Sequence, residues 1–195
     1  MNMSNHSAGF TMVEVLVSMI IFSVGLIGIA KMQVVAKQSN YDAVQRVAAT
    51  SIAEDLLSRM RSNHEVLSDY VSNTGSTTLG SNSISTQPSP NCSSGSTCTA
   101  TQLAAHDLWE IEQLLDGVTE LDASSNKTGG INLPTMCITG DSTGASGVYT
   151  VTVVWRGKAA LSNQSANTCG TSSGNYGNSN EFRRLLVMQA YITNI

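Results

Sequence analysis

The sequence predicts an α+β protein in which a long N-terminal helix, membrane-embedded in its first half, packs on a C-terminal antiparallel sheet. Three observations carry this prediction: an unbroken apolar run over residues 15–30, helical spacing of apolar residues as far as Met60, and alternating apolar residues near the C-terminus. Helix signals come first and strand signals follow, without alternating. One long helix followed by an antiparallel sheet gives an α+β class.

Composition narrows the possible functions. The 195 residues allow one domain with an appended element, and 41% hydrophobic residues can support a folded core. Only 12% of the residues are charged, and the formal net charge is -4 with no basic run. We therefore expect no nucleic-acid partner.

The apolar run is the most informative segment. Residues 15–30 are all apolar, Gly or Ser, and the charges of Glu14 and Lys31 border them. A helix of this length measures about 24 Å, and flanking apolar residues extend it toward the roughly 30 Å hydrocarbon core. A secretory signal peptide would carry a basic stretch before the run and a small-residue cleavage site after it. Here the small residues precede the run and end at Gly9, so we expect a membrane-embedded helix.

A specific motif lies at residues 9–17, which read Gly-Phe-Thr-Met-Val-Glu-Val-Leu-Val. It resembles the processing site of type IV prepilins and of type II secretion pseudopilins. In that family a membrane peptidase cuts after the Gly, the new N-terminal Phe is N-methylated, and the Glu is used in assembly. The resemblance implies these roles for Gly9, Phe10 and Glu14. Residues 10–28 are most similar to the minor pilins of the PilV group, the type IV pilus modification proteins.

Glu14 also has a physical interpretation. A carboxylate in lipid costs roughly several kcal/mol unless it finds a partner. After cleavage the nearest positive group would be the new amine of Phe10, in the same helix or in an adjacent subunit of a staggered bundle. The alternative is that Glu14 lies at the membrane interface of an uncleaved signal anchor.

The second half of the helix is predicted to be amphipathic and to lie against a globular head. Asp42 with Arg46, and Asp55 with Arg59, are expected to form i,i+4 pairs on the polar side. No Pro interrupts the pattern, so we expect one helix from about Phe10 to about Arg61. Its apolar residues recur at three- and four-residue steps: Val44, Val47, Ala48, Ile52, Leu56 and Met60.

The head is predicted to contain a helix and a sheet. Residues 73–101 are rich in Ser, Thr, Gly and Asn and are expected to form a loop with at most short strands. Residues 102–115 resume helical spacing, and Gly117 is placed to end that helix. Strands are expected at residues 132–139, 147–155 and 184–192.

Four cysteines in an exported head predict two disulfides, and four cysteines allow three pairings. We favour Cys92 with Cys98, and Cys137 with Cys169. The alternative is a zinc site from Cys92, Cys98 and His106, but it lacks a C-x-x-C spacing and a clear fourth ligand. We expect no metal and no cofactor.

Enzyme motifs point to structural roles. Residues 140–144 fit G-x-S-x-G, but a strand rather than a helix follows, so a hairpin turn is expected. His106 and Asp107 are adjacent on a helix, point to different sides, and are expected to be solvated. Trp109 and Trp155 are expected to be core or interface anchors. No catalytic residue is expected.

The predicted organisation is a cleaved leader over residues 1–9, the membrane half of the helix over residues 10–36, and an extracytoplasmic head over residues 37–195. We expect a non-enzymatic minor pilin, held in the bacterial inner membrane by a single pass with its head in the periplasm, and then assembled into a pilus. The resemblance implies a prepilin peptidase, other minor pilins, the major pilin and a tip adhesin as partners. The alternatives are a type II secretion pseudopilin and a signal-anchored periplasmic binding protein or enzyme.

Overall fold

The structure is a computed structural model that describes residues 9–71, 76–94, 97–118, 120–124, 129–162 and 165–194. The chain divides into two compact units, Met1–Asn40 and Tyr41–Ile195. Apart from Gly9, the expected leader lies outside the described residues.

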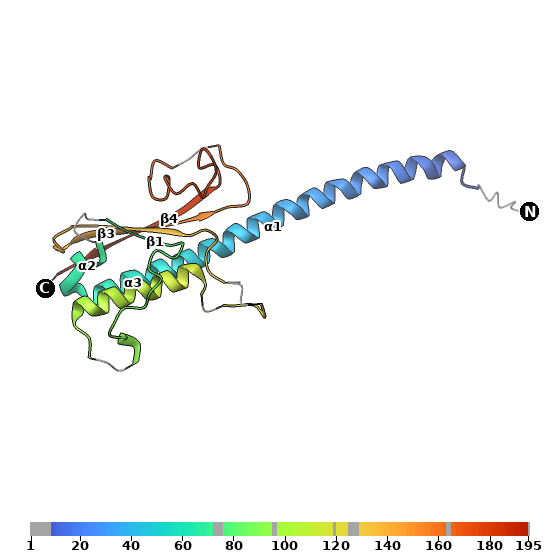
Figure 1. Cartoon of the computed structure of the whole chain (residues 1–195). Coiled ribbons are helices and arrows are strands. Elements are labelled where there is room, and N and C mark those ends of the chain that lie inside the picture. Colours follow the sequence, from blue (N-terminus) through green and yellow to red (C-terminus); the bar gives the residue numbers. More distant parts are fainter. Residues whose placement is uncertain are drawn as a thin grey trace, which may run out of the picture. The chain divides into compact units, whose positions relative to one another are not determined.

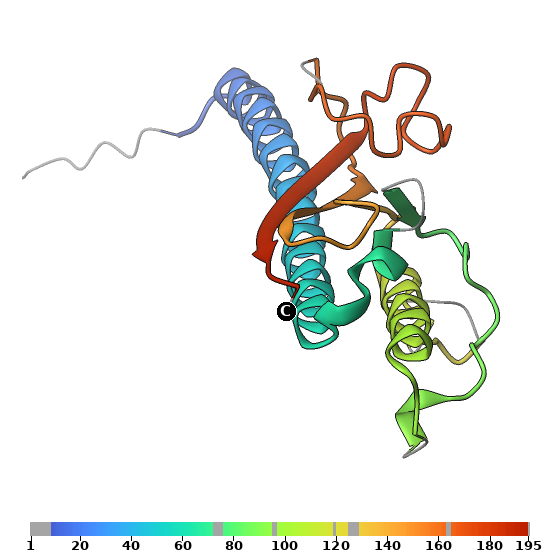
Figure 2. The same cartoon turned by 90° about the vertical axis from the view of Figure 1, so that its left-hand side faces the viewer.

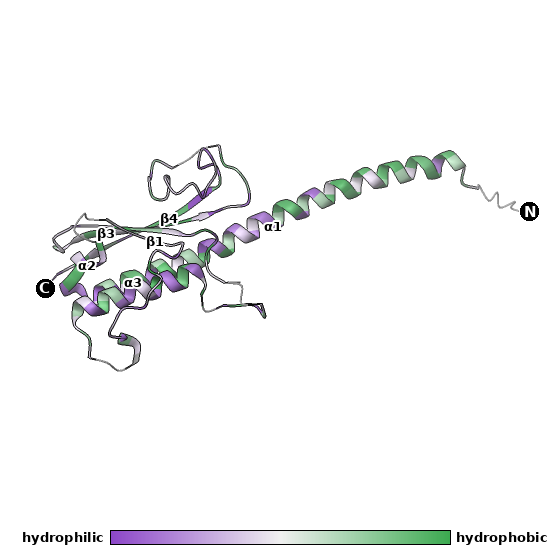
Figure 3. Cartoon of the chain, viewed as in Figure 1, coloured by the Kyte–Doolittle hydropathy of each residue, from purple (hydrophilic) through white to green (hydrophobic). Residues whose placement is uncertain are grey.

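The long N-terminal helix is confirmed. Helix α1 spans Met12–Ser62, 51 residues without a break (Figure 1). In the first unit, every side chain from residue 9 to residue 37 is exposed. Figure 3 shows that this part of α1 is predominantly hydrophobic. The second unit contains the rest of α1 and all the other elements, and it is called the head below.

The head contains a four-stranded antiparallel sheet with the order β1-β2-β3-β4. Its three longer strands confirm the expected ones, whereas β1 lies in a stretch expected to be mostly loop. The pairing aligns Cys137 of β2 with Thr152 of β3, and Thr152 with Val187 of β4. The strand bounds are Ser76–Leu79 for β1, Thr135–Thr139 for β2, Gly147–Arg156 for β3 and Arg183–Ile192 for β4.

Helix α3, Ala100–Asp116, confirms the expected second helix and has clear start and stop signals. Thr99 and Gln102 form a capping box at its start, and Gly117 ends it with φ 62°, in the left-handed region that favours glycine. Three short elements complete the head: the 3-10 helices η1 (His64–Val66) and η2 (Cys92–Ser94), and helix α2 (Leu67–Val71).

One hydrophobic core joins the helices to the inner face of the sheet. Leu56 and Met60 of α1 pack in the same cluster as Ile111 of α3. Strands β2, β3 and β4 present alternate residues to it, among them Ile138, Val151 and Ala190. The buried residues of α1 are Gln45, Ala49, Ile52, Ala53, Leu56, Leu57 and Met60.

Two expectations for the second half of α1 are wrong. Val44 and Val47 are exposed rather than buried. Val47 is nine residues from Leu56, about two and a half turns at 3.6 residues per turn, so the two side chains point to opposite sides. Asp42 pairs with Arg184 of β4 (Oδ2 to Nε, 3.3 Å) rather than with Arg46. Asp42 therefore pairs with a residue far away in the sequence and not with the arginine one turn along its own helix.

Both expected disulfides are present. Cys92 bonds to Cys98, and Cys137 on β2 bonds to Cys169 in the loop before β4. Cys169 packs with Val154 and Tyr176 in a second, small buried cluster on the outer face of the sheet. The Tyr176 hydroxyl donates to the Leu133 carbonyl (2.9 Å). The long polar loop is therefore fastened to the sheet by a covalent bond and by a buried aromatic ring.

Candidate functional site

The N-terminal motif begins α1 with a capping box. The Thr11 hydroxyl accepts a hydrogen bond from the Glu14 N–H (3.3 Å), and Glu14 Oε2 accepts from the Thr11 N–H (2.9 Å). The Thr11 hydroxyl also lies 3.0 Å from the same carboxylate oxygen. A Ser or Thr followed three residues later by Glu is the sequence signature of this cap. Sequence reasoning assigned Glu14 an assembly role and missed the cap.

Gly9 and Phe10 precede the cap and are open to an approaching enzyme. Phe10 is 90% exposed. A side chain added at Gly9 would meet nothing within 4 Å, so the fold itself does not require glycine there. Packing in the described structure therefore does not explain why this position is glycine. Recognition of Gly9 by a peptidase stays a prediction.

The apolar part of α1 has the features of a membrane span. By length and composition this helix can cross a membrane, and none of its most hydrophobic window is buried in the fold. Two serines in the stretch return their hydroxyls to the helix: Ser18 Oγ donates to the Val15 carbonyl (2.8 Å), and Ser23 Oγ to the Met19 carbonyl (2.7 Å). These bonds satisfy the hydroxyl donors without water, as a lipid environment requires.

In the head, a buried polar network contradicts the expectation that His106 and Asp107 are solvated: their residue exposures are 2% and 5%. Asp107 accepts from Arg59 Nη1 (2.9 Å) and from the Tyr70 hydroxyl (2.6 Å). Arg59 also contacts Glu110, and its expected pair with Asp55 is confirmed at 3.2 Å. These partners come from α1, α2 and α3, so helical spacing within α3 could not reveal them.

The network shifts the titration of two of its members. Burial and the hydrogen bond to Asp107 raise the pKa of the Tyr70 phenol above its ordinary value. Partial burial of Arg59 disfavours its charge, but hydrogen bonds to the three carboxylates outweigh this and raise its pKa. Both groups are therefore held in their protonated forms. The arrangement joins α1, α2 and α3 through charged and hydrogen-bonded side chains.

His106 lies beside this network. One ring nitrogen, Nε2, is 3.1 Å from Asn91 Oδ1, and the ring packs 5.5 Å from that of Trp109. The alternative zinc site is contradicted, because Cys92 and Cys98 form a disulfide. Trp155 is buried in the core as expected, and Trp109 is half-buried on α3.

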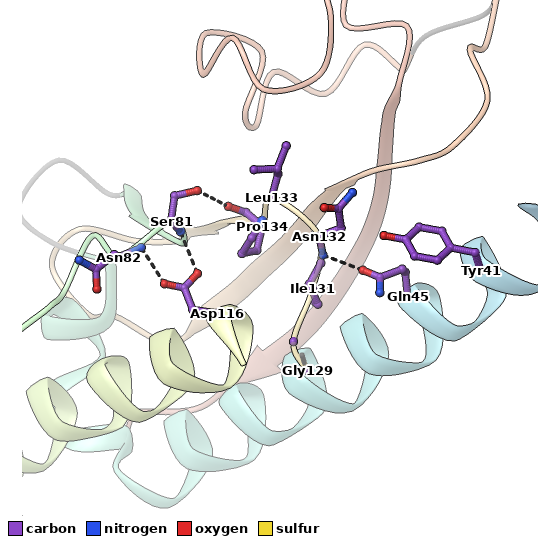
Figure 4. Close-up of a pocket in the computed structure, with 11 residues that line it drawn as sticks. Tyr41, Gln45, Ser81, Asn82, Asp116, Gly129, Ile131, Asn132, Leu133 and Pro134 are labelled. Atoms are coloured by element: carbon purple, nitrogen blue, oxygen red, sulfur yellow. Dashed lines mark hydrogen bonds between the residues drawn. The ribbon is translucent and has the colours of Figure 1, made fainter. Parts of the chain in front are cut away.

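A cavity of about 510 Å³ in the head lies where α1, the turn after β1 and the segment before β2 meet (Figure 4). Asp116 accepts from the N–H groups of Ser81 (3.1 Å) and Asn82 (2.7 Å). Gln45 accepts from the Asn132 N–H (2.8 Å). The Asp116 and Gln45 side chains thus hold loop segments against the helices through hydrogen bonds. None of the sequence-predicted site residues lines this cavity.

The G-x-S-x-G match is a hairpin turn, as expected. Strand β2 ends at Thr139 and its antiparallel partner β3 begins at Gly147. Asp141 Oδ1 accepts from the Thr143 hydroxyl and from the Thr143 N–H (2.7 Å), and these bonds lower the pKa of the Asp141 carboxyl. Such an Asx turn reverses the chain and presents no nucleophile elbow.

A capped apolar helix that continues into a head with a four-stranded antiparallel sheet defines a pilin-like α+β fold. Residues 31–109 match the family described as type IV pilin Tt1218, and residues 4–30 match the prokaryotic N-terminal methylation motif. Comparison with curated proteins and with solved structures gave no match. The two matched segments are adjacent and support a pilus or pseudopilus component, anchored in a membrane by its N-terminal helix. The similarity is to structural subunits and not to enzymes.

Proposed function

We propose that the chain is a minor pilin of the PilV group. It would contribute to the assembly, initiation or tip structure of a type IV pilus through helix packing and contacts between heads. Its partners would be a prepilin peptidase, other minor pilins, the major pilin and a tip adhesin. Before assembly it would span the bacterial inner membrane once, with the head in the periplasm.

The observation that carries this proposal is the exposure of the apolar half of α1. Every side chain from residue 9 to residue 37 is exposed, although residues 15–30 are apolar, Gly or Ser. Such a surface is stable only in lipid or against other apolar helices. A subunit that moves from a membrane into a helix bundle uses both environments in turn.

The second half of α1 adds support for packing against other subunits. Val44 and Val47 are exposed on the side of α1 that faces away from the head's core. A shallow surface there is lined by Ala43, Val47 and Thr50, together with the polar residues Arg46, Ser51 and Glu54. In a fibre, helices from adjacent subunits would cover the exposed side of α1 that carries Val44 and Val47.

Glu14 would set the register between subunits. Both hydrogen bonds that the Glu14 carboxylate accepts from Thr11 end on Oε2, so Oε1 can accept a bond from the amine of a neighbouring Phe10. A carboxylate can hold both donors because each oxygen accepts separately. Glu14 would thus cap its own helix and pair with the adjacent one.

Processing provides the direct test. N-terminal sequencing of the mature chain from membranes and from sheared surface fibres should find Phe10 at the terminus. Gly9→Val should block cleavage, because a side chain obstructs close approach of the peptidase to the backbone. Gly25→Val is the matched control: it also adds a side chain where nothing lies within 4 Å, but it lies inside α1 and away from the cut, so this variant should be cleaved normally.

An intact N-terminus in the wild-type chain would contradict the proposal and favour a signal-anchored protein. A chain cleaved at Phe10 but missing from surface fibres, and recovered only with a secretion apparatus, would favour the pseudopilin.

A further inference from the structure

Strand β4 is an edge of the sheet. It pairs with β3 along its whole length, from Arg183 to Ile192, and it is last in the strand order. Figure 2 shows β4, in red, as a long strand at the margin of the sheet. In the part of the chain that the structure describes, no strand lies on its other side.

The pairing fixes which backbone groups face outward. Just beyond the ladder, the Gly157 N–H donates to the Phe182 carbonyl (2.8 Å). Hydrogen-bonded and non-bonded pairs alternate in an antiparallel ladder, so the even-numbered residues of β4 bond to β3. The N–H and C=O groups of the odd-numbered residues point to the open edge. The outward-facing residues are Leu185, Val187, Gln189 and Tyr191.

This edge lacks the features that usually prevent strand addition. From residue 185 to residue 192 there is no charge and no Pro, and the register with β3 contains no bulge. Val187 is 42% exposed and Tyr191 is 65% exposed. The nearby arginines are engaged inside the head: Arg183 donates to the Cys169 carbonyl, and Arg184 pairs with Asp42.

We propose that the open edge of β4 receives an extended strand from a neighbouring subunit of the fibre, which extends the sheet by one strand. A row of alternating N–H and C=O groups is complemented by another extended backbone. The incoming strand would be uncharged and rich in β-branched or aromatic residues, because its side chains would lie beside Val187 and Tyr191. This inference rests on the proposed function.

A pair of β4 strands from two free copies is the less favoured occupant. Four outward residues are few beside the roughly 20–30 residues a side of a standard interface. Such a small contact forms when the two partners are already held together, because tethering raises the effective concentration. Packing of neighbouring α1 helices in a fibre would supply that tether.

The experiment compares two variants at one position. Gln189→Pro removes an outward N–H and leaves the bonds to β3 intact, since Pro is tolerated on an edge strand. Gln189→Ala keeps the N–H and loses the same side chain, including its bond to Thr150 (3.2 Å). We expect Gln189→Pro to be cleaved and folded but depleted in sheared fibres, and Gln189→Ala to enter them at the wild-type level.

Hydrogen exchange of the full-length wild-type chain gives a second readout. The N–H groups of the outward residues should exchange rapidly in detergent and on the order of 100-fold more slowly in fibres. The N–H groups of Leu186 and Met188 should be protected in both states.

Three results would overturn the inference. Equal recovery of the two variants in fibres, or rapid exchange of the outward amides in fibres, would reject strand addition and leave the pilin function standing. Protection in detergent that rises with protein concentration would identify a second free copy as the occupant. A wild-type chain absent from fibres would reject the proposed function together with this inference.

Discussion

The disulfide between Cys137 and Cys169 should stabilise the head more than the one between Cys92 and Cys98. The two bonds differ in the length of chain that they close, with sequence separations of 32 and 6. In the loop-entropy relation, these lengths correspond to about 3.7 and about 2.2 kcal/mol of denatured-state entropy. Replacing each pair with alanines should therefore lower the free energy of unfolding by amounts that differ by about 1.5 kcal/mol.

Urea unfolding of the full-length chain in detergent measures this difference. Trp109 lies on α3 and Trp155 on β3, so tryptophan fluorescence reports the helical and sheet parts of the head. Each double-alanine variant serves as the control for the other. The long loop also keeps its Tyr176 anchor, so loss of its disulfide should leave the loop attached to the sheet through Leu133 and Thr135. An equal loss for both variants, or a larger loss for the Cys92 and Cys98 pair, would refute the loop-entropy reasoning.

Three further outcomes are expected. Thr11→Val should fray the start of α1 at a cost of about 1 kcal/mol, measured as faster amide exchange there. This variant should still enter fibres, whereas Glu14→Val should be depleted from them. Equal recovery of the two variants in fibres would deny Glu14 a role beyond capping. Tyr70→Phe should lower the free energy of unfolding by about 1.5–3 kcal/mol, because the Tyr70 hydroxyl bonds a buried carboxylate. Tyr149→Phe loses a bond to a neutral carbonyl and should lower it by about 0.5–1.5 kcal/mol. A reversed order of the two losses in chemical denaturation would contradict this. The raised pKa of Tyr70 predicts alkaline instability: above pH about 10 the unfolded chain releases the phenolic proton while the folded chain keeps it, so stability falls as pH rises. Unfolding titrations between neutral and alkaline pH should show a shallower fall for Tyr70→Phe, and an unchanged slope would exclude this phenol as a cause.

The features that sequence revealed depend on local patterns. The apolar run and the helical spacing fixed α1, and the alternation of Tyr149, Val151 and Val153 identified β3. The favoured Cys pairs followed from the predicted elements: Cys92 with Cys98 closes a small loop, and Cys137 on a predicted strand ties the polar segment that contains Cys169 to the sheet. The cap at Thr11 was missed, although a local pattern marks it: Thr and Glu stand three residues apart before an apolar run.

The remaining features depend on contacts that no local pattern contains. Strand β1 consists mainly of Ser and Thr, and it exists because Thr77 and Leu79 find register partners on β2. Asp107 looked like a surface residue because Arg59 and Tyr70, its partners, lie in other helices. Val47 fitted the helical spacing and still points outward, because it lies on the side of α1 opposite Leu56, and the core with α3 and the sheet forms on the Leu56 side.

The cap at the start of α1 has one more consequence. Its donors and acceptors belong to Thr11 and Glu14, and the proposed scissile bond joins Gly9 to Phe10, outside them. Removing the leader would change the charge next to the helix without disturbing the bonds that define where the helix begins. The precursor and the mature subunit would therefore present the same helix start to a partner. The difference at that start would be the positive charge of the new amine on Phe10.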